Sequence, residues 1–350
     1  MSASQHKNFF QSAKELFQKP IEGPRKIKIT VFGPRGVGKT SLLTAMSEQF
    51  DRTTQKTVLM LRPELKTSLI MQDKRAELKS CFDNQDELEA RGGIKGTTET
   101  QDFEFSLVKA GMDASVKLFF KDFPGKDLIS DIESVTNLLD ECGIVLIAID
   151  APALMEEDGR WHDLINKPNL VTDYFKTAYQ NLKEPRLVIF VPLKCEKYMR
   201  QYPANLLNRV HEGYSSLIEF FDKPNLRYHV VAVVTPIQTL GNVEFSRIKV
   251  QNLNGHPYPQ FYFRKTNTAT YAPRDCEQPL RYLLRFLLKI HLEQRFVIWK
   301  YLRKALGDIF EDIAFKEAAI EFAKNCKTTG GFAILQDEEG WLNMSRCGRR

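Results

Sequence analysis

A glycine-rich turn that ends in lysine and threonine is the stretch of this sequence best suited to chemistry. Residues 31–43 read VFGPRGVGKTSLL, in which Gly33, Gly38, Lys39 and Thr40 satisfy the spacing G-x-x-x-x-G-K-[ST]. Glycines allow consecutive backbone N–H groups to point into one concavity, and the N-terminus of a following helix adds a positive dipole. Lys39 can reach the β- and γ-phosphates of a nucleotide, and the Thr40 hydroxyl can ligate Mg²⁺. The turn is therefore predicted to bind a nucleoside triphosphate through Gly33, Arg35, Gly36, Val37, Gly38, Lys39, Thr40 and Ser41.

The order of further motifs resembles that of the Ras-like, translation-factor-related P-loop GTPases, over residues 27 to about 236. Proteins of that class carry D-x-x-G after the third strand, and the stretch KLFFKDFPGKD supplies Asp122 and Gly125 directly after an apolar run. The resemblance implies that Asp122 holds Mg²⁺ through water and that the Gly125 amide meets the γ-phosphate. It also implies GTP and GDP as the ligands.

The same class has a threonine just before the second strand, whose hydroxyl reaches Mg²⁺ and whose amide touches the γ-phosphate. The stretch GGIKGTTETQDFEF offers Thr98 as the first choice and Thr97 as the alternative. The other interpretation is a threonine-rich loop that makes no metal contact. Its three glycines would let the segment order and disorder with the nucleotide, as switch loops do.

The base-reading element departs from the family pattern. Ras-like GTPases carry N-K-x-D after the fifth strand, whereas VIFVPLKCEKY places Leu193, Lys194 and Glu196 at the matching positions. The Glu196 carboxylate can accept hydrogen bonds from guanine N1 and N2, and the Lys194 stem can lie along the base. Leu193 cannot supply the bracing hydrogen bonds of asparagine, which costs about 1 kcal/mol. The alternative interpretation of this stretch is a solvent-exposed charged loop after a core strand. A second, weaker base-side match lies in VVTPIQ, where Thr235 and Pro236 replace the usual Ser-Ala.

A competing interpretation starts from Asp150, which ends the apolar run GIVLIAID. P-loop ATPases place their Mg²⁺-linked acidic residue at the end of such a strand, and Asp122 would then be an ordinary surface carboxylate. We favour Asp122 because the threonine pair and the Lys194–Glu196 stretch follow the GTPase order around it. A P-loop kinase would need a mobile lid that carries arginine, and we identify none.

Hydrolysis is expected to be slow in the isolated protein. Many Ras-like members place a water-orienting glutamine after the D-x-x-G glycine, where this sequence has Lys126. Arg35 either acts on the γ-phosphate from within the loop or faces solvent. We expect an activating protein or homodimerisation to accelerate turnover, and an effector to read the GTP-bound state. The alternative is a nucleotide-gated scaffold with little hydrolysis. The departures from the family pattern faintly resemble the double-GTPase proteins of bacterial conflict systems.

The candidate residues that contact phosphate, metal and base must be positioned by a sheet. Strand-like runs alternate with helical stretches near 39–50, 128–142, 170–183 and 203–222, which predicts an α/β, doubly wound, mostly parallel six-stranded sheet. The six strands are expected at KIKITVFG, TQDFEFSLV, SVKLFFKDF, GIVLIAID, RLVIFVP and YHVVAVVTP. We expect an N-terminal helix and linker over 1–24 and a P-loop GTPase domain over 25–278, with insertions near 51–92 and 151–184. A C-terminal helical extension and tail is expected over 279–350.

Composition is that of a globular protein in a reducing compartment. Of the 350 residues, 43% are hydrophobic and 27% are charged, and no apolar run reaches the length of a membrane span. The start lacks the features of a signal peptide. The six cysteines are scattered without a CxxC pair, which argues against a zinc site or a disulfide framework and favours a cytoplasmic location.

The positive charge is concentrated in residues 280–304, which contain seven Lys or Arg and one acidic residue. Arg281, Arg285 and Lys289 stand four apart on one face of the predicted helix. One interpretation is a packed helix whose basic side chains extend out of the core. The other is a docking face for an acidic partner or an anionic membrane surface, with the protein then peripheral at the membrane. No basic groove interleaved with aromatic residues is visible, so we expect no nucleic-acid partner.

Overall fold

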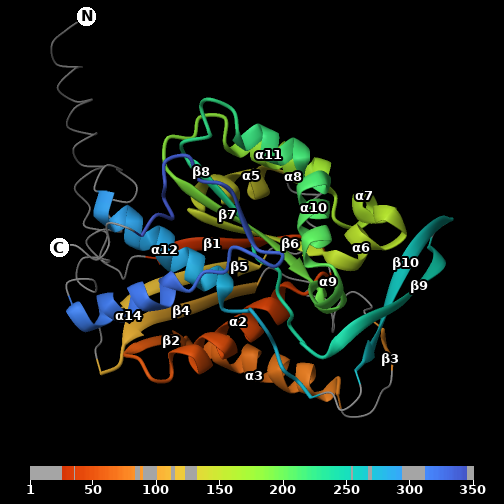
Figure 1. Ribbon diagram of the computed structural model, residues 1–350, viewed down its shortest axis with the longest axis horizontal. Coiled ribbons are helices and arrows are strands. Elements are labelled where there is room, and N and C mark those ends of the chain that lie inside the picture. Colours follow the sequence, from red (N-terminus) through yellow and green to blue (C-terminus); the bar gives the residue numbers. More distant parts are fainter. Residues whose placement is uncertain are drawn as a thin grey trace, which may run out of the picture.

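An eight-stranded, mostly parallel sheet forms the centre of the protein (Figure 1). The computed structural model describes residues 26–34, 36–82, 87–89, 101–111, 115–122, 132–253, 255–266, 270–293 and 312–344. The strand order is β11-β8-β7-β6-β1-β5-β4-β2. The strands are β1 Lys26–Phe32, β2 Leu59–Pro63, β4 Gln101–Lys109, β5 Ser115–Asp122, β6 Ile144–Asp150, β7 Arg186–Leu193, β8 Val230–Val234 and β11 Ala333–Gln336. Strands β5, β1, β6, β7 and β8 run parallel, and β4 pairs antiparallel with β5.

The predicted fold class is confirmed, and its six strands are the central six. The predicted number of strands is wrong, because two short strands join the edges. β2 comes from the stretch interpreted as the first insertion and pairs antiparallel with β4. β11 comes from the C-terminal tail and pairs antiparallel with β8. Every residue of β6 and β7 is buried, as expected for parallel strands covered on both faces.

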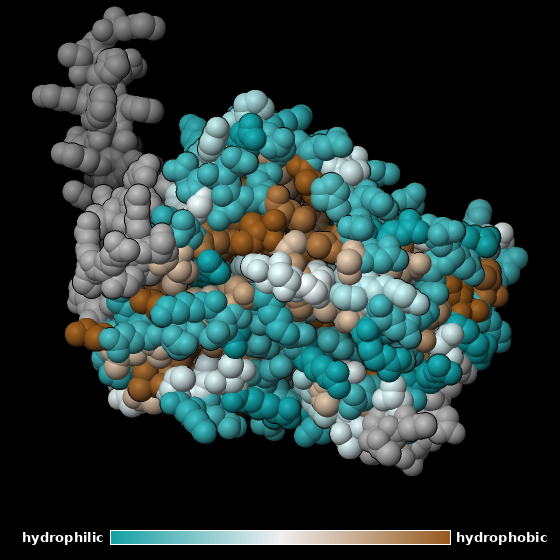
Figure 2. Space-filling model, viewed as in Figure 1, coloured by the Kyte–Doolittle hydropathy of each residue, from teal (hydrophilic) through white to brown (hydrophobic). Residues whose placement is uncertain are grey.

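Helices cover both faces of the sheet (Figure 1). On one face, α2 Lys39–Thr54, α12 Gln278–Glu293 and α14 Ile313–Lys324 share one hydrophobic core with the sheet. α3 Leu65–Ser80 packs beside α2 on β2 and β4 and adds Met71 to this core. On the other face, a second core is formed by α5 Ile132–Glu141, α8 Pro168–Ala178, α10 Pro203–Gly213 and α11 Ser215–Phe221. Figure 2 shows hydrophilic side chains over most of this view and an apolar band between α11 and α12. Within the described ranges, no helix is long and apolar enough to cross a membrane.

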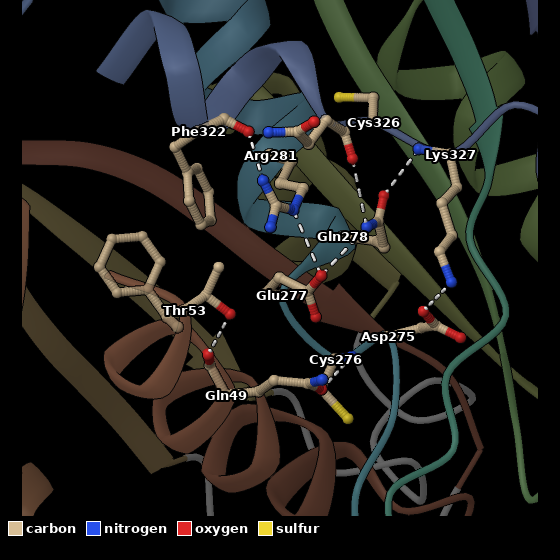
Figure 3. A network of polar contacts seen from close by, with 12 residues as sticks. Gln49, Thr53, Asp275, Cys276, Glu277, Gln278, Arg281, Phe322, Cys326 and Lys327 are labelled. Atoms are coloured by element: carbon tan, nitrogen blue, oxygen red, sulfur yellow. Dashed lines mark hydrogen bonds and ion pairs between the residues drawn. The ribbon is translucent and has the colours of Figure 1, made fainter. Parts of the chain in front are cut away.

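The basic residues of α12 are buried or half-buried, and Figure 3 shows the contacts of Arg281. Arg281 is buried, donates from Nη1 to the Phe322 carbonyl at 2.5 Å and pairs through Nε with Glu277 at 3.2 Å. Lys289 is also buried, and Arg285 donates to the Leu342 carbonyl. The prediction of an exposed basic docking face is therefore wrong for these three positions, because α14 and the C-terminal tail pack over them. Residues 294–304 lie outside the described residues.

A second, three-stranded sheet projects from the body of the protein (Figure 1). Its order is β3-β10-β9, with β3 Glu87–Glu89, β9 Val243–Leu253 and β10 His256–Lys265. Phe245, Phe261 and Phe263 fill its inner face against Ala153 and Trp161 of the stretch that follows β6. The sequence analysis did not predict this hairpin.

Candidate functional site

The glycine turn lies at the carboxyl edge of the parallel sheet, between β1 and α2. β1 pairs in parallel with β5 on one side and β6 on the other, so the turn faces the ends of both neighbours. Gly36 and Gly38 have φ angles of 78° and 110°, and Gly38 is the N-cap of α2. Side chains are disfavoured at such angles, so glycine is required for the chain to curl into the helix here. The predicted strand–turn–helix context of the motif is present.

Close backbone packing holds the turn in place. A Cβ atom on Gly33 would lie 2.6 Å from the carbonyl oxygen of Ala148 on β6, so only glycine fits there. A Cβ atom on Gly38 would lie 3.8 Å from Leu193 Cδ1, which places the end of β7 beside the turn. Val37 is buried in the core and donates its N–H to the Pro34 carbonyl at 3.4 Å. The turn is thus a cradle packed against β6 and close to the end of β7.

Lys39 directs its ammonium group back over this cradle. Its Nζ donates to the carbonyl oxygens of Gly33 at 3.2 Å and Pro34 at 3.3 Å, and the residue is 7% exposed. Thr40 and Ser41 follow in the first turn of α2 and are half-buried. A phosphate group in the cradle would meet one cation, the amides of the turn and the N-terminus of a 16-residue helix.

The other predicted phosphate- and metal-side residues fall largely outside the described part of the chain. Arg35, Thr97, Thr98, Gly125 and Lys126 are outside it, and only the backbone of Asp122 is described. That backbone pairs with Val31, two residues before Gly33, and with Gln101 on β4. The end of β5 therefore lies next to the glycine turn, and Asp122 as a Mg²⁺ ligand stays a prediction. Within the described ranges, no group of three or more His, Cys, Asp or Glu side chains could hold a metal ion.

Lys194 is paired with Asp150. Its Nζ lies 2.6 Å from Asp150 Oδ2, and the two side chains are 17% and 4% exposed. Lys194 has a φ angle of 57° directly after β7, where non-glycine residues are uncommon. Asp150 also caps α6 Ala151–Met155, because its Oδ1 accepts the Ala153 N–H at 3.1 Å. Its carboxylate is therefore already engaged on both oxygens, which disfavours Asp150 as the metal-linked acid of an ATPase.

Glu196 is buried at the start of α9 Glu196–Gln201 and does not lie in an exposed loop. Its Oε1 accepts the backbone N–H groups of Leu240 at 3.2 Å and Gly241 at 3.3 Å. Burial raises the pKa of Glu196 from 4.5 to about 7, against the lowering effect of these hydrogen bonds. The interpretation as a solvent-exposed charged loop is wrong, because the carboxylate anchors the segment after β8. Base reading by Glu196 stays a prediction, and it would compete with this anchoring.

Thr235 lies at the start of that same anchored segment. Its N–H donates to the Phe190 carbonyl at 2.8 Å, and the residue is fully buried. In the described part of the chain its Oγ1 is buried without a hydrogen-bond partner. The structure thus brings the segments around residues 193–196 and 235–241 together beside the glycine turn.

Two residues that were not assigned from the sequence, Asn166 and His162, connect Asp150 to α10. Asn166 bonds to the backbone of Asp150 on both sides, and its amide contacts His162, which in turn contacts Gly213. Asp150 followed by a proline at the second helical position is a helix N-cap signal that the sequence did offer. The long-range partners carry no sequence signal, because they come together only through packing.

The sequence matches no protein-family model and no curated protein. Among solved structures, the GTPase-like domain of S. cerevisiae Ski7 bound to GTP is 14% identical with a TM-score of 0.38, over 62% of this chain and 43% of that chain. The same domain bound to GDP and inorganic phosphate is 13% identical with a TM-score of 0.38, over 62% and 44%. The signal recognition particle receptor SRb-GTP/SRX complex from Chaetomium thermophilum is 13% identical with a TM-score of 0.37, over 61% of this chain and 94% of that chain. The match thus spans less than half of the Ski7 chains, and the fold assignment rests on the sheet order and the glycine turn.

Proposed function

We propose that this protein is a GTP-binding switch that hydrolyses GTP to GDP and phosphate with Mg²⁺. The observation that carries the proposal is the glycine turn wedged against Ala148, with Lys39 folded back onto the carbonyls of Gly33 and Pro34. Those carbonyls are neutral acceptors, whereas phosphate oxygens are charged. The Lys39 ammonium is charged in either case, but only a phosphate adds attraction between opposite charges in this largely buried place, so a bound phosphate would draw Lys39 from the carbonyls of the turn. Lys39 would then neutralise charge on the β- and γ-phosphates.

The metal would be held by few protein groups. Thr40 and Asp122 would hold Mg²⁺, which prefers one or two protein ligands together with phosphate oxygens and, when bound, neutralises their charge. Thr98 is three residues before Gln101 in the sequence, and Gln101 pairs with Asp122. A three-residue connection spans about 10 Å at most. This length supports Thr98 as the switch threonine. Gly125, three residues after Asp122 in the sequence, is proposed as the amide donor to the γ-phosphate.

Guanine recognition is proposed for the segments that meet beside the turn. Lys194 would lie along the base, and Glu196 and Thr235 would complete the pocket. A carboxylate favours guanine because guanine offers an N1–H and N2–H donor pair that adenine lacks. Each hydrogen bond to a charged group contributes about 1.5–3 kcal/mol. The engagement of Asp150 with Lys194 and Ala153 speaks against the ATPase alternative.

Turnover is proposed to be slow without a partner. Lys126 stands where many Ras-like proteins have a water-orienting glutamine, and we assign Arg35 a contact with the γ-phosphate. An activating protein or a second copy of the chain would accelerate hydrolysis, and an effector would read the GTP-bound form. A nucleotide-gated scaffold with little hydrolysis is the alternative within the same binding proposal. A cytoplasmic location and the likeness to double-GTPase proteins remain hypotheses.

Competition of GTP and ATP for binding, with and without Mg²⁺, tests the proposal most directly. Wild-type protein should bind a fluorescent GTP analogue, unlabelled GTP should displace it better than ATP, and Lys39→Ala should lose binding at least 100-fold. Lys28→Ala is the matched control, because Lys28 lies on β1 and pairs with Glu141 at the surface. Equal loss in both variants, or no binding of any purine triphosphate by the wild type, would overturn the proposal. Single-turnover phosphate release then separates a GTPase from a scaffold.

A further inference from the structure

The stretch that follows β6 ends in a chain of hydrogen bonds that reaches Lys194. We propose that Asp150, Asn166 and His162 form a positioning relay that holds the Lys194 ammonium in place and thereby slows nucleotide release. This inference rests on the proposed function, because it concerns the lysine that would lie along the base. The proposal gives residues 151–166 a function, whereas the sequence alone suggests that they are part of an insertion.

The first link is the ion pair between Lys194 and Asp150. Asp150 and Leu193 are register partners at the ends of neighbouring parallel strands, so Lys194 is the first residue beyond the pairing. Its left-handed conformation, with φ at 57°, is unfavourable by about 1–2 kcal/mol for a residue with a side chain. The 2.6 Å contact with a carboxylate that is 4% exposed offsets this cost. Without Asp150, Lys194 would lose the partner that sets the direction of its side chain.

The second link immobilises Asp150 itself. Asn166 is 2% exposed, and its Oδ1 accepts the Asp150 N–H at 2.8 Å. The Asn166 Nδ2 donates to the Asp150 carbonyl at 3.1 Å. Ala153 supplies a third hydrogen bond, from its N–H to Asp150 Oδ1. One amide side chain therefore fastens the backbone of Asp150 on both sides, while α6 fixes its carboxylate.

The third link fixes the orientation of Asn166. Its Nδ2 lies 3.0 Å from His162 Nδ1, and His162 Nε2 lies 3.2 Å from the Gly213 carbonyl. A carbonyl can only accept, so the proton of a neutral imidazole belongs on Nε2 and Nδ1 accepts from Asn166. Burial lowers the pKa of His162, which keeps the ring in this neutral form. A Cβ atom on Gly213 would lie 2.7 Å from His162 Nε2, so α10 approaches the ring as closely as it can.

The relay takes the place of the asparagine that this chain lacks. Leu193 is buried and lies close to Gly38, so it can brace the turn by packing but not by hydrogen bonds. A free lysine side chain has about 2 kcal/mol of rotamer entropy to lose on ordering. Holding the ammonium before the ligand arrives removes part of that cost, and such preorganisation acts mainly on the dissociation rate. Asp150 is therefore a positioning residue rather than a catalytic one.

A double-mutant cycle on the full chain tests the relay. The measured quantity is the dissociation rate of fluorescent GDP in the presence of Mg²⁺. Asp150→Asn and Lys194→Met should each raise the rate about 5- to 20-fold, and Asp150→Asn should add less than twofold in the Lys194→Met background. Asn166→Ala leaves both members of the ion pair in place. It should raise the rate about 3-fold, again only when Lys194 is present, and it carries the test should Asp150→Asn fail to fold.

Lys197 on α9 and Glu156, which directly follows α6, provide the matched control pair, with an Nζ–Oε1 distance of 2.6 Å. Lys197→Met and Glu156→Gln should leave the dissociation rate unchanged. Equal effects of Asp150→Asn with and without Lys194, or no effect at all in a protein that binds GDP, would overturn the relay alone. A wild-type protein that binds no purine nucleotide would overturn the proposed function instead.

Discussion

Gly33 and Ala148 are in backbone contact: a Cβ atom on Gly33 would lie 2.6 Å from the Ala148 carbonyl oxygen. Gly33→Ala should therefore push the glycine turn away from β6. Because both contacting groups belong to the backbone, neither can move aside as a side chain would. We expect a loss of about 2–4 kcal/mol in the free energy of unfolding, measured by urea denaturation. Nucleotide binding should fall at least 10-fold even where the variant is fully folded.

Gly111→Ala is the control for this prediction. Gly111 has a φ angle of 82°, and a Cβ atom there would meet nothing within 4 Å. Gly111→Ala should lower the free energy of unfolding by only about 1–2 kcal/mol, which is the cost of a side chain at a left-handed backbone position, and should leave nucleotide binding intact. Equal nucleotide affinity in the two variants would show that the turn tolerates displacement.

Because Glu196 is buried with a raised pKa, we expect the stability of the protein to depend on pH. In the unfolded chain its pKa is 4.5, and burial raises it to about 7 in the folded protein. Between these values the folded protein holds a proton that the unfolded chain has released, so rising pH favours unfolding. The penalty is absent below about pH 4.5 and complete above about pH 7. Glu196→Gln should therefore gain roughly 1–3 kcal/mol relative to wild type when the pH is raised from 5 to 8, by urea denaturation at each pH.

Glu219 on α11 serves as the comparison, because its side chain is exposed. Glu219→Gln should change stability by less than about 0.5 kcal/mol. A Glu196→Gln variant whose stability difference from wild type does not vary with pH would contradict the buried, raised-pKa environment.

Arg281 and Glu277 form a buried ion pair at the start of α12 (Figure 3). Arg281 also lies over the Phe322 ring at 4.3 Å from its centroid. Arg281→Met removes the partner of a buried carboxylate, and Glu277 Oε2 has no hydrogen-bond partner among the described residues. We expect a loss of about 3–5 kcal/mol in the free energy of unfolding.

The double variant Glu277→Gln with Arg281→Met should recover at least half of that loss, because it removes the unpaired charge. Chemical denaturation of the three proteins gives the coupling. Additive losses in the double variant would mean that Arg281 stabilises α12 by packing on Phe322 alone.

A substitution at Gly241 tests the packing of the segment that Glu196 anchors. A Cβ atom on Gly241 would lie 1.7 Å from the Ala272 carbonyl oxygen, at a φ angle of 78°. Gly241→Ala should separate this segment from residue 272 and weaken the hydrogen bond to Glu196, with a loss of more than about 3 kcal/mol. Gly255→Ala, with a φ angle of 84° and nothing within 4 Å, should lose only about 1–2 kcal/mol in the same thermal or urea assay.

Local signals in the sequence determined the glycine turn, its flanking strand and helix, and the six central strands. Gly33, Lys39 and Thr40 are close in sequence, and their spacing alone dictates a strand–turn–helix unit. Continuous apolar runs such as 144–149 and 187–191 predict strands covered on both faces, because no other element hides every side chain over so short a length. These features depend on residues within one element and its immediate neighbours.

Tertiary structure decided every contact whose partners are distant in the sequence. From the sequence alone, Asp150 is equally compatible with a metal ligand and with an ion pair, and the structure pairs it with Lys194 at 2.6 Å. Glu196 is likewise compatible with an exposed loop, and the structure places the amides of residues 240 and 241 on its carboxylate. The basic residues of α12 could form a docking face until α14 and the tail cover them. The residue type alone does not tell whether a carboxylate or an ammonium group faces water, forms an ion pair or contacts a ligand. Its role is therefore set by which elements the packing of the two cores brings around it.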